Sequence, residues 1–535
     1  MEEFDFIVIG AGSAGCVLAD RLSADGRNKV LVLEAGGSDR KFFIKMPIGY
    51  GKLFYDEKVN WKYETEPVDG LAGRTSYWPR GRVIGGSSSI NAMCYVRGLP
   101  SDFNDWRDMG NPGWGWQDVL PYFKRSETFV DRDGNSHGGG PLYVSDVYRD
   151  MHPLKEHYKA AAREMGLPVS DSMIDDPEGI GFYQINTKNG VRCSAADAFL
   201  RPAMKRGNVK LESNAEVTRV LLDGKMATGV EYVQGGVRFK AAARREVIVS
   251  GGAINSPKLL QLSGVGPSDL LRKHGIEVVL DQKNVGANLQ DHLGISYFYR
   301  ATVPTLNNQL TPWWGKLLLG MRYVLTRSGP LSLSVNQGGG FVKSDEKQKR
   351  PNLQLYFNPI SYRTETSGER RLMHPDPYPG FIMSFQPCRP SSRGHLEIRS
   401  GNPVDKPAIH PNYLSTNQDI EDVIAGGRLI QRMAGTPTIQ KLVKAAEGPD
   451  VSTMNDEEIV QDFRERSGSI FHPVSTCMMG PDPQSSVVDS KLRVHGLERL
   501  RIVDASVFPT VTSGNTNAPT IMVGQKAAEE ILSGC

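Results

Sequence analysis

Apolar residues follow two different patterns along this chain. Near the N-terminus, the continuous apolar runs 7–9 and 30–33 are typical of parallel strands that are covered on both faces. Much later, residues 352–357, 381–386 and 395–399 alternate apolar with polar side chains, which predicts antiparallel strands. Together the patterns predict a mixed α/β fold that contains a parallel sheet and an antiparallel sheet.

Helical spacing of apolar residues predicts the elements that cover these strands. Amphipathic helices are expected at 154–166, 313–326 and 420–434, and a last helix at 520–532. Residues 100–128 are also predicted to be helical, with several aromatic side chains as anchors. The helices at 313–326 and 420–434 flank the alternating segments, so the antiparallel sheet is expected to be backed by helices.

Strands of the N-terminal kind return after an interruption. Residues 239–249 lead into Ser250-Gly251-Gly252 and then into another helix, which repeats the strand–turn–helix order of the N-terminus. The chain is therefore expected to visit two domains alternately. We assign a Rossmann-like nucleotide-binding domain to residues 1–155, 203–293 and 455–535, and a substrate domain to residues 156–202 and 294–454.

The turn after the first strand carries the clearest binding motif. Gly10, Gly12 and Gly15 have the G-x-G-x-x-G spacing, which permits a tight turn, a close approach of a pyrophosphate and close helix–strand packing. Glu34 ends the next strand, at the distance where a carboxylate holds a ribose hydroxyl. An ADP-containing dinucleotide is therefore expected here, and these residues leave NAD and FAD as alternatives.

A second glycine- and serine-rich turn lies at residues 81–93 and opens a short helix. Its small residues and free N–H groups suit a phosphate or the edge of a flavin. An ordinary helix cap would use the same residues. The pattern alone leaves both interpretations open.

Charge and composition exclude several classes of protein. The chain has 535 residues with 63 basic and 60 acidic side chains, a balance that argues against nucleic-acid binding. Its six cysteines form no C-x-x-C pair, and there is neither a basic leader nor a long apolar segment. No metal-binding motif such as H-E-x-x-H is present, so no metal is expected. We predict a cytoplasmic protein without a transmembrane segment, and leave peripheral membrane association open.

Two residues near the C-terminus are candidates for chemistry. His472 lies in a mostly apolar segment with few charges, where an imidazole could take a proton from an alcohol; a core histidine with a backbone hydrogen bond is the alternative. Asn515 precedes the last helix and is either catalytic or a turn former. The N-terminus of that helix could stabilise negative charge on a reduced flavin. Aromatic residues that line a substrate pocket or simply fill the core are Phe471, Trp313, Tyr356 and Phe357.

Taken together, these segments resemble the glucose–methanol–choline (GMC) oxidoreductases over nearly the full length of the chain. The motifs that carry the resemblance are the N-terminal glycine turn, residues 81–91, residues 252–267, and the stretch from Phe471-His472-Pro473 to residues 515–519. The resemblance implies FAD rather than NAD. Within the family the chain is similar to bacterial choline-dehydrogenase-like and alcohol-oxidising members.

The resemblance also implies roles for individual residues. His472 would accept the hydroxyl proton of a primary alcohol, Asn515 would orient the alkoxide oxygen, and the α-carbon would pass a hydride to the flavin. Some relatives bind FAD covalently through a histidine where this chain has Ile90, so FAD is expected to be non-covalent. The implied FAD contacts are Gly10, Gly12, Ser13, Ala14, Gly15, Glu34, Ala35, Trp61, Val83, Gly86, Asn91, Ala92, Met93, Cys94, Val217, Asp504, Ala505, Asn517 and Pro519.

Several alternatives stay open at this stage. The leading expectation is a small-molecule alcohol substrate with oxygen or a quinone-type compound as electron acceptor. A flavin-containing lyase of the same family, similar to the hydroxynitrile lyases, is the alternative. No cage for a trimethylammonium group with an acidic partner is visible, so choline is not favoured. Both a monomer and a homodimer are compatible with the sequence.

Overall fold

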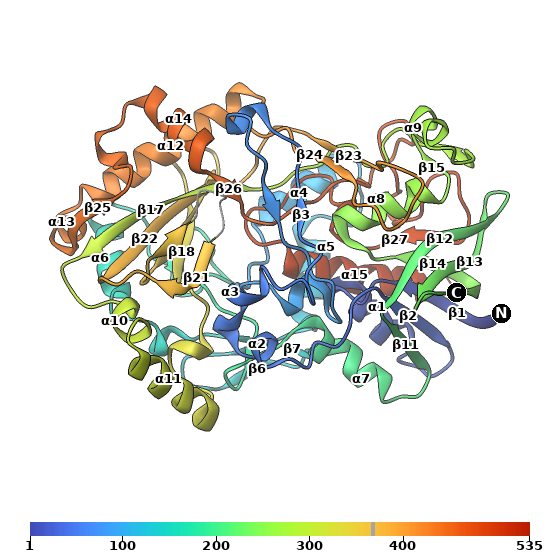
Figure 1. Ribbon diagram of the computed structural model, residues 1–535, viewed down its shortest axis with the longest axis horizontal. Coiled ribbons are helices and arrows are strands. Elements are labelled where there is room, and N and C mark those ends of the chain that lie inside the picture. The colour runs from blue at the N-terminus through green and yellow to red at the C-terminus, as the bar shows by residue number, and fades with distance from the viewer. Residues whose placement is uncertain (365–369, 535) are drawn as a thin grey trace.

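The computed structural model describes residues 1–364 and 370–534, and Figure 1 shows a molecule with sheets at its two ends. At one end, the described strands form a seven-stranded sheet of order β11-β2-β1-β14-β13-β12, with β27 paired to β14. Its members are β1 (Glu2–Ile9), β2 (Val30–Glu34), β11 (Val209–Ser213), β12 (Ala215–Asp223), β13 (Met226–Gln234), β14 (Val237–Val249) and β27 (Leu500–Ile502).

The parallel core of this first sheet confirms the prediction from the apolar runs. β1 is parallel to both β2 and β14, and Ile7, Val8 and the whole of β2 are buried. Helices α1 (Ser13–Leu22) and α15 (Asn517–Ser533) pack against each other beside this sheet. Because β27 and α15 come from the end of the chain, this unit is built from segments that lie far apart in the sequence, as predicted.

The second sheet is antiparallel, as the alternating segments predict. In the described residues its order is β18-β19-β22-β17-β25, with β26 paired to β17. β19 and β22 are buried at every position, so both of their faces are covered, and α12 (Asn417–Ala434) contacts β22. The strands are β17 (Leu293–Ala301), β18 (Gly338–Val342), β19 (Leu353–Asn358), β22 (Gly380–Pro387), β25 (Val443–Glu447) and β26 (Gly468–Ser469).

Three details differ from the sequence prediction. The strand predicted at 395–399 is the short β23 (His395–Glu397), which pairs with β24 (Ala408–His410) outside the second sheet. Residues 100–128 form two helices, α4 (Pro100–Asp108) and α5 (Trp116–Ser126), rather than one helical stretch. Helix α14 (Asp456–Arg466) packs on α12, although the predicted boundary at residue 455 assigns the two helices to different domains.

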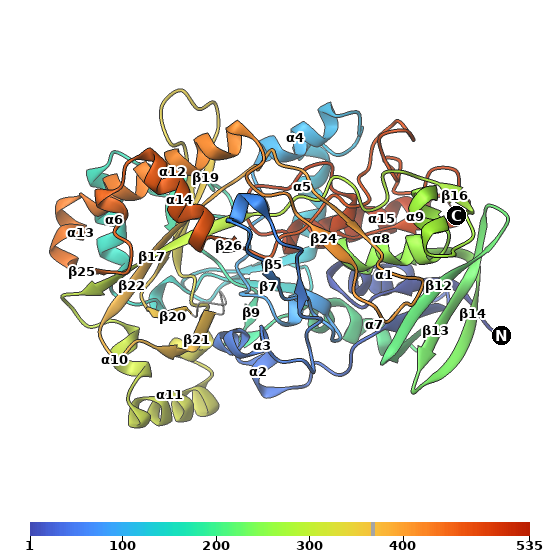
Figure 2. The ribbon, with the colours of Figure 1, turned by 45° about the horizontal axis from the view of Figure 1, so that its top comes forward.

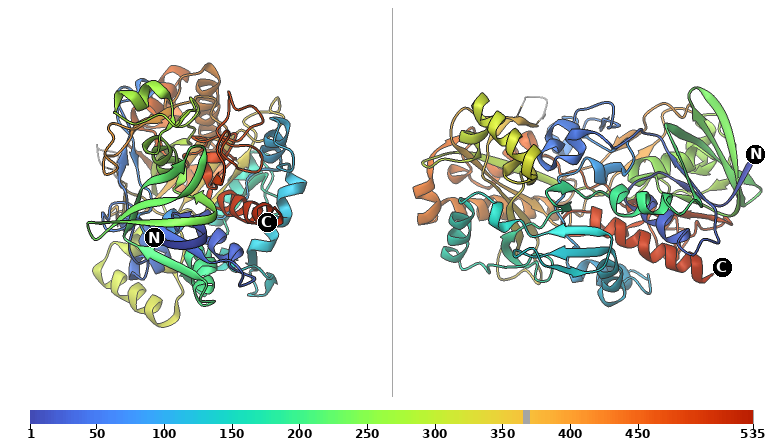
Figure 3. Two further views of the ribbon diagram at one scale, coloured as in Figure 1. Left: turned by 90° about the vertical axis from the view of Figure 1, so that its right-hand side faces the viewer. Right: turned by 90° about the horizontal axis from the view of Figure 1, so that it is seen from below.

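The remaining elements connect and cover the sheets (Figures 2 and 3). The helices are α2 (Phe42–Lys45), α3 (Tyr50–Leu53), α6 (Lys155–Glu164), α7 (Arg201–Met204), α8 (Gly252–Leu262), α9 (Ser268–Lys273), α10 (Leu306–Leu310), α11 (Trp313–Thr326) and α13 (Pro437–Leu442). The short strands are β3 (Tyr63–Glu64), β4 (Tyr77–Trp78), β5 (Glu127–Val130), β6 (Ser136–Gly138), β7 (Leu142–Ser145), β8 (Gly179–Phe182), β9 (Thr187–Lys188), β10 (Val191–Arg192), β15 (Val265–Gly266), β16 (Leu280–Asp281), β20 (Tyr362–Thr364) and β21 (Arg370–Pro375).

Candidate active site

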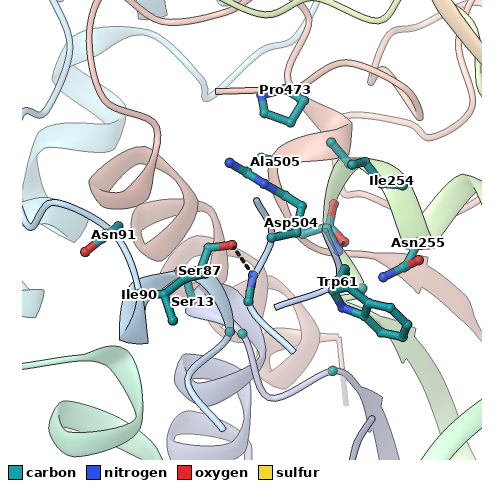
Figure 4. A pocket seen from close by; sticks show the side chains of 18 of the residues that line it. Ser13, Trp61, Ser87, Ile90, Asn91, Ile254, Asn255, Pro473, Asp504 and Ala505 are labelled. Atoms are coloured by element: carbon teal, nitrogen blue, oxygen red, sulfur yellow. Dashed lines mark hydrogen bonds between the residues drawn. The ribbon is translucent and has the colours of Figure 1, made fainter. Parts of the chain in front are cut away.

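A long pocket begins at the carboxyl ends of β1 and β2 and reaches the loop that carries His472. Gly10 and Glu34 line it at one end, and His472 and Asn515 line it at the other. Figure 4 shows side chains that converge on it from the first glycine turn, the second glycine turn and the end of the chain. A ligand in this pocket would touch residues from both halves of the protein.

Two helix N-termini point into the pocket and make it suitable for an anionic cofactor. Gly12 precedes α1 and Thr516 precedes α15, and neither residue caps its helix with a side chain. The first N–H groups of a helix are free to bind a phosphate or a developing negative charge. Ser13 Oγ donates to Asn517 Oδ1 over 2.7 Å, which fixes the two helix starts relative to each other.

At the two glycine turns the backbone packs so closely against neighbouring backbone that no side chain fits. Gly10 has φ of 101°, and a Cβ atom there would lie 2.5 Å from the Ser250 carbonyl oxygen. At Gly86, with φ of 53°, a Cβ atom would lie 2.8 Å from the Gly12 Cα atom. The second glycine turn is thus pressed against the first, which supports its interpretation as a cofactor site.

Replacing Gly86 by alanine is expected to lower the affinity for FAD at least tenfold, because the added methyl group must displace the turn at Gly12. The ratio of flavin absorbance to protein absorbance after purification measures this loss. Gly26→Ala is the matched control: its φ is 77° and no atom lies near the added methyl group. Equal FAD content in the Gly86 and Gly26 variants would contradict the placement of FAD at this contact.

Glu34 organises the nucleotide end of the pocket. Its two carboxylate oxygens accept hydrogen bonds from the N–H groups of Ala11, over 2.9 Å, and Gly36, over 2.8 Å. Burial raises the pKa of the Glu34 carboxyl to about 7, against the opposing effect of these hydrogen bonds. Each oxygen keeps a second lone pair, which can accept a ribose hydroxyl.

His472 and Asn515 lie in direct contact, as the resemblance implies. The Asn515 Nδ2 atom is 3.0 Å from His472 Nε2. Burial, followed by the nearby His292 and Arg80, holds the pKa of His472 well below its ordinary value, so the imidazole is neutral near pH 7. Asn515 Oδ1 is buried and has no hydrogen-bond partner among the described residues, which leaves it available to a ligand.

A second histidine, which the sequence interpretation missed, fixes the tautomer of His472. His292 Nε2 lies 2.8 Å from the Cys388 carbonyl oxygen, and His292 Nδ1 lies 2.9 Å from His472 Nδ1. Because a carbonyl oxygen can only accept, His292 Nε2 must carry a hydrogen. Burial lowers the pKa of His292 to about 4, so the ring is neutral and has no second hydrogen. Its Nδ1 is therefore an acceptor. His472 Nδ1 must then donate, and His472 Nε2 is left without a hydrogen, so it accepts from Asn515 Nδ2.

A buried carboxylate holds the backbone beside His472. Asp291 Oδ1 accepts the His472 N–H over 2.6 Å, and Asp291 Oδ2 accepts the hydroxyls of Ser469, over 2.5 Å, and Tyr413. Burial raises the pKa of Asp291 to about 6. Phe471 has φ of 70°, a conformation that non-glycine residues adopt only under constraint. These bonds supply that constraint, and Asp291 is a second residue that the sequence interpretation missed.

The structure gathers most of the residues predicted to bind the cofactor. Three of them do not line the pocket. Gly15 packs instead against the Gly10 carbonyl, Val83 belongs to a buried cluster around Ile44, and Pro519 is buried in the first turn of α15. Those that line it are Gly10, Gly12, Ser13, Ala14, Glu34, Ala35, Trp61, Gly86, Asn91, Ala92, Met93, Cys94, Val217, Asp504, Ala505 and Asn517.

Trp61 lines the pocket on a different side from residues 90 and 91. It stacks on Tyr63, whose hydroxyl donates to Asn255 Oδ1 over 2.7 Å, and Arg82 covers the indole at 4.8 Å. Figure 4 shows Trp61 beside Asn255 and away from Ile90 and Asn91. Trp61 and residues 90–93 all line the pocket, so a contact between Trp61 and FAD stays a prediction. Ile90 itself lines the pocket with an aliphatic side chain that offers no atom for a covalent bond to a flavin.

Two of the four aromatic residues predicted for a substrate pocket are misplaced. Phe471 and Tyr356 do line the pocket. Trp313 is 76% exposed on the outer face of α11, and Phe357 is stacked on Tyr158 within the core. Phe357 follows Tyr356 in β19, and neighbouring residues of a strand point to opposite faces. Only Tyr356 therefore faces the pocket.

Comparison with known proteins agrees with this geometry. A GMC oxidoreductase family model matches residues 4–294, and a second one matches residues 390–524. The chain is 41% identical to an alcohol dehydrogenase [acceptor] of Pseudomonas putida over 99% of this chain and 96% of that protein. It is 42% identical to an oxygen-dependent choline dehydrogenase of Vibrio vulnificus over 99% of this chain and 94% of that protein.

Solved structures share the fold over its full extent. Pyridoxine 4-oxidase from Mesorbium loti superposes with a TM-score of 0.86, at 29% identity and 98% coverage of both chains. Formate oxidase from Aspergillus oryzae gives a TM-score of 0.91, at 26% identity, with 100% of this chain and 98% of that chain covered. The chain therefore belongs to the GMC oxidoreductase family and is an FAD-dependent enzyme that oxidises an alcohol.

Proposed function

We propose that this enzyme oxidises an uncharged, lipophilic primary alcohol to the aldehyde, with His472 as the base and Asn515 as the group that orients the substrate oxygen. The observation that supports the proposal most is the unprotonated Nε2 atom of His472, which lies 3.0 Å from Asn515 Nδ2 at one end of the pocket. The names of the relatives refer to dehydrogenases and oxidases, which agrees with a redox reaction rather than the lyase alternative.

Different residues take the proton, bind the substrate oxygen and hold the cofactor. His472 Nε2 takes the hydroxyl proton, since it is neutral and its other nitrogen is occupied as a donor to His292. Asn515 Nδ2 has a second hydrogen, which can donate to the substrate oxygen as its negative charge grows. Non-covalently bound FAD would supply the acceptor for the two electrons and the hydrogen that leave the carbinol carbon. The uncapped start of α15 places positive potential beside the pocket.

The lining near His472 favours an uncharged substrate. It is rich in aromatic and aliphatic side chains, which include Tyr50, Phe54, Met93 and Ile470. The carboxylates that line the pocket in the described residues are Glu34, Glu216 and Asp504. Glu34 ends β2 and Glu216 lies in β12 of the nucleotide-binding sheet, whereas Asp504 already accepts hydrogen bonds from Gly252 and Ser256. Asp291, the carboxylate beside His472, does not line the pocket and already accepts hydrogen bonds from His472 and Ser469. Near His472 the described lining therefore offers a quaternary ammonium group no carboxylate partner.

A panel of alcohols tests the proposal. Anaerobic mixing with straight-chain primary alkanols or benzyl alcohol should bleach the flavin absorbance, whereas choline at the same concentration should reduce it at least tenfold more slowly. Parallel assays for hydrogen peroxide in air and for reduction of a soluble quinone then identify the electron acceptor. Bleaching by choline alone would overturn the proposed substrate class, and no bleaching by any primary alcohol would overturn the reaction.

A further inference from the structure

Helix α11 presents an apolar face to solvent. Leu325 is 82% exposed and Trp313 is 76% exposed, values that are unusual for large apolar side chains of a globular protein. In Figures 1 and 2 the helix lies along the lower edge of the molecule, with no drawn element outside it. The exposed apolar residues on this face, which we call the α11 face, include Trp313, Trp314, Leu317, Leu318, Val324 and Leu325.

The helix is held in place by its opposite side. Gly315 and Tyr323 are buried, and the Tyr323 hydroxyl donates to the Gly190 carbonyl over 3.2 Å. Leu319 packs with Tyr323 in a hydrophobic cluster that also contains Phe54 and Met93, two residues of the pocket lining. The apolar outer face is therefore presented by a helix that is docked, at its inner side, on the substrate end of the site.

Charges border this face on both sides and have one sign. With about 100° between successive residues of a helix, Lys316 falls on one margin of the apolar arc and Arg322 falls on the other. Between Asp291 and Asp345 the sequence contains no aspartate or glutamate. Lys316 and Arg322 are exposed, so both ammonium and guanidinium groups can reach outward beside the apolar face.

A neighbouring segment adds an exposed aromatic side chain beside the helix. Phe42 at the start of α2 is 52% exposed and meets both Tyr323 of α11 and Phe43 edge-to-face. Arg40 and Lys41 precede it in the chain. The nearby Asp39 is fully buried and paired with Lys45 and Arg201, so it does not oppose the basic surface.

We propose that the α11 face docks on the surface of a membrane that contains anionic lipids. Tryptophan and leucine on one face, with cations on both margins, is the arrangement by which a helix lies in the headgroup region. No helix in the described residues is long and apolar enough to cross a membrane, so α11 would lie on the bilayer. The inference rests on the surface alone and is independent of the proposed reaction.

Sedimentation with lipid vesicles tests this inference on the FAD-loaded enzyme. Vesicles of phosphatidylcholine with one-quarter phosphatidylglycerol should bind the protein at least tenfold more tightly than pure phosphatidylcholine, and added salt should weaken the binding. Leu325→Glu should lower this binding at least tenfold. Val404→Glu is the matched control and should bind like the wild type. Val404 is 77% exposed in the segment between β23 and β24, which Figure 1 shows far from α11.

Two further readouts make the outcome decisive. Tryptophan fluorescence should shift to the blue with anionic vesicles, and the shift should disappear in a Trp313→Phe, Trp314→Phe double variant. Turnover of a water-soluble alcohol with a soluble quinone should be unchanged in Leu325→Glu, which shows that the variant is folded. The proposal would be overturned if the wild type did not bind vesicles, or if Leu325→Glu bound them equally well. It would also be overturned if the wild type did not bind vesicles but formed a dimer that Leu325→Glu dissociates.

Discussion

Replacement of His472 by alanine lowers the rate of alcohol-driven flavin reduction by about 10²–10⁴-fold, the contribution expected of a well-placed general base. FAD stays bound, because the helix starts and glycine turns that form the nucleotide end of the pocket do not depend on the imidazole. Anaerobic stopped-flow mixing with a saturating alcohol measures the rate, and the flavin spectrum of the purified variant measures FAD content.

The control for this experiment is His137→Ala. His137 is exposed and pairs with Asp131, so its loss should leave the rate unchanged. In the wild type, the acid limb of the pH–rate profile should lie below pH 6.5, the ordinary value for histidine, because burial disfavours the charged imidazolium and keeps the base neutral to lower pH. A wild-type rate in His472→Ala, with FAD bound, would show that another group takes the proton.

Replacement of His292 by leucine lowers the same rate by about tenfold to a hundredfold, although His292 does not face the pocket. Leucine cannot accept from His472 Nδ1, and an unsatisfied buried donor costs about 1–3 kcal/mol. The proton of His472 then moves to Nε2, where it blocks the basic position. The rate of flavin reduction and the FAD content, measured as for His472→Ala, test this expectation.

The matched variant is His292→Gln. A glutamine oxygen can accept from His472 Nδ1, so this variant should retain more activity than His292→Leu. A purely structural role would instead lower the stability of both variants and leave the rate of the folded fraction unchanged. Equal rates for glutamine, leucine and the wild type, normalised to bound FAD, would contradict the role of His292 in setting the tautomer.

The sequence alone predicts the fold well where the pattern depends on local periodicity. Helix α11 has the predicted bounds, and β19 and β22 lie within about one residue of theirs. Periodicity does not reveal which side of a helix is covered, because an apolar stripe looks the same whether another element or a membrane lies on it. Trp313 was therefore predicted inside a pocket and is found on the surface.

Contacts between segments that are distant in the sequence are the part of the site that could not be predicted from the sequence. His472 and Asn515 are predicted by family motifs, but His292 lies in an ordinary Asp-His-Leu stretch 180 residues from His472. Nothing in its neighbours indicates that β17 and β26 pair and bring the two imidazoles together. Asp291 is hidden for the same reason, since its partners Tyr413 and Ser469 are also distant in sequence.

The hydrogen bond between Ser13 and Asn517 has a consequence for biosynthesis. These residues are separated by 504 positions, and α1 and α15 pack against each other. A nascent chain can form β1, the first glycine turn and α1 early. The part of the pocket that α15 lines is absent until α15 has left the ribosome. The growing chain is therefore expected to keep its cofactor site incomplete until α15 has emerged, and only from that point can FAD contact α1 and α15 together.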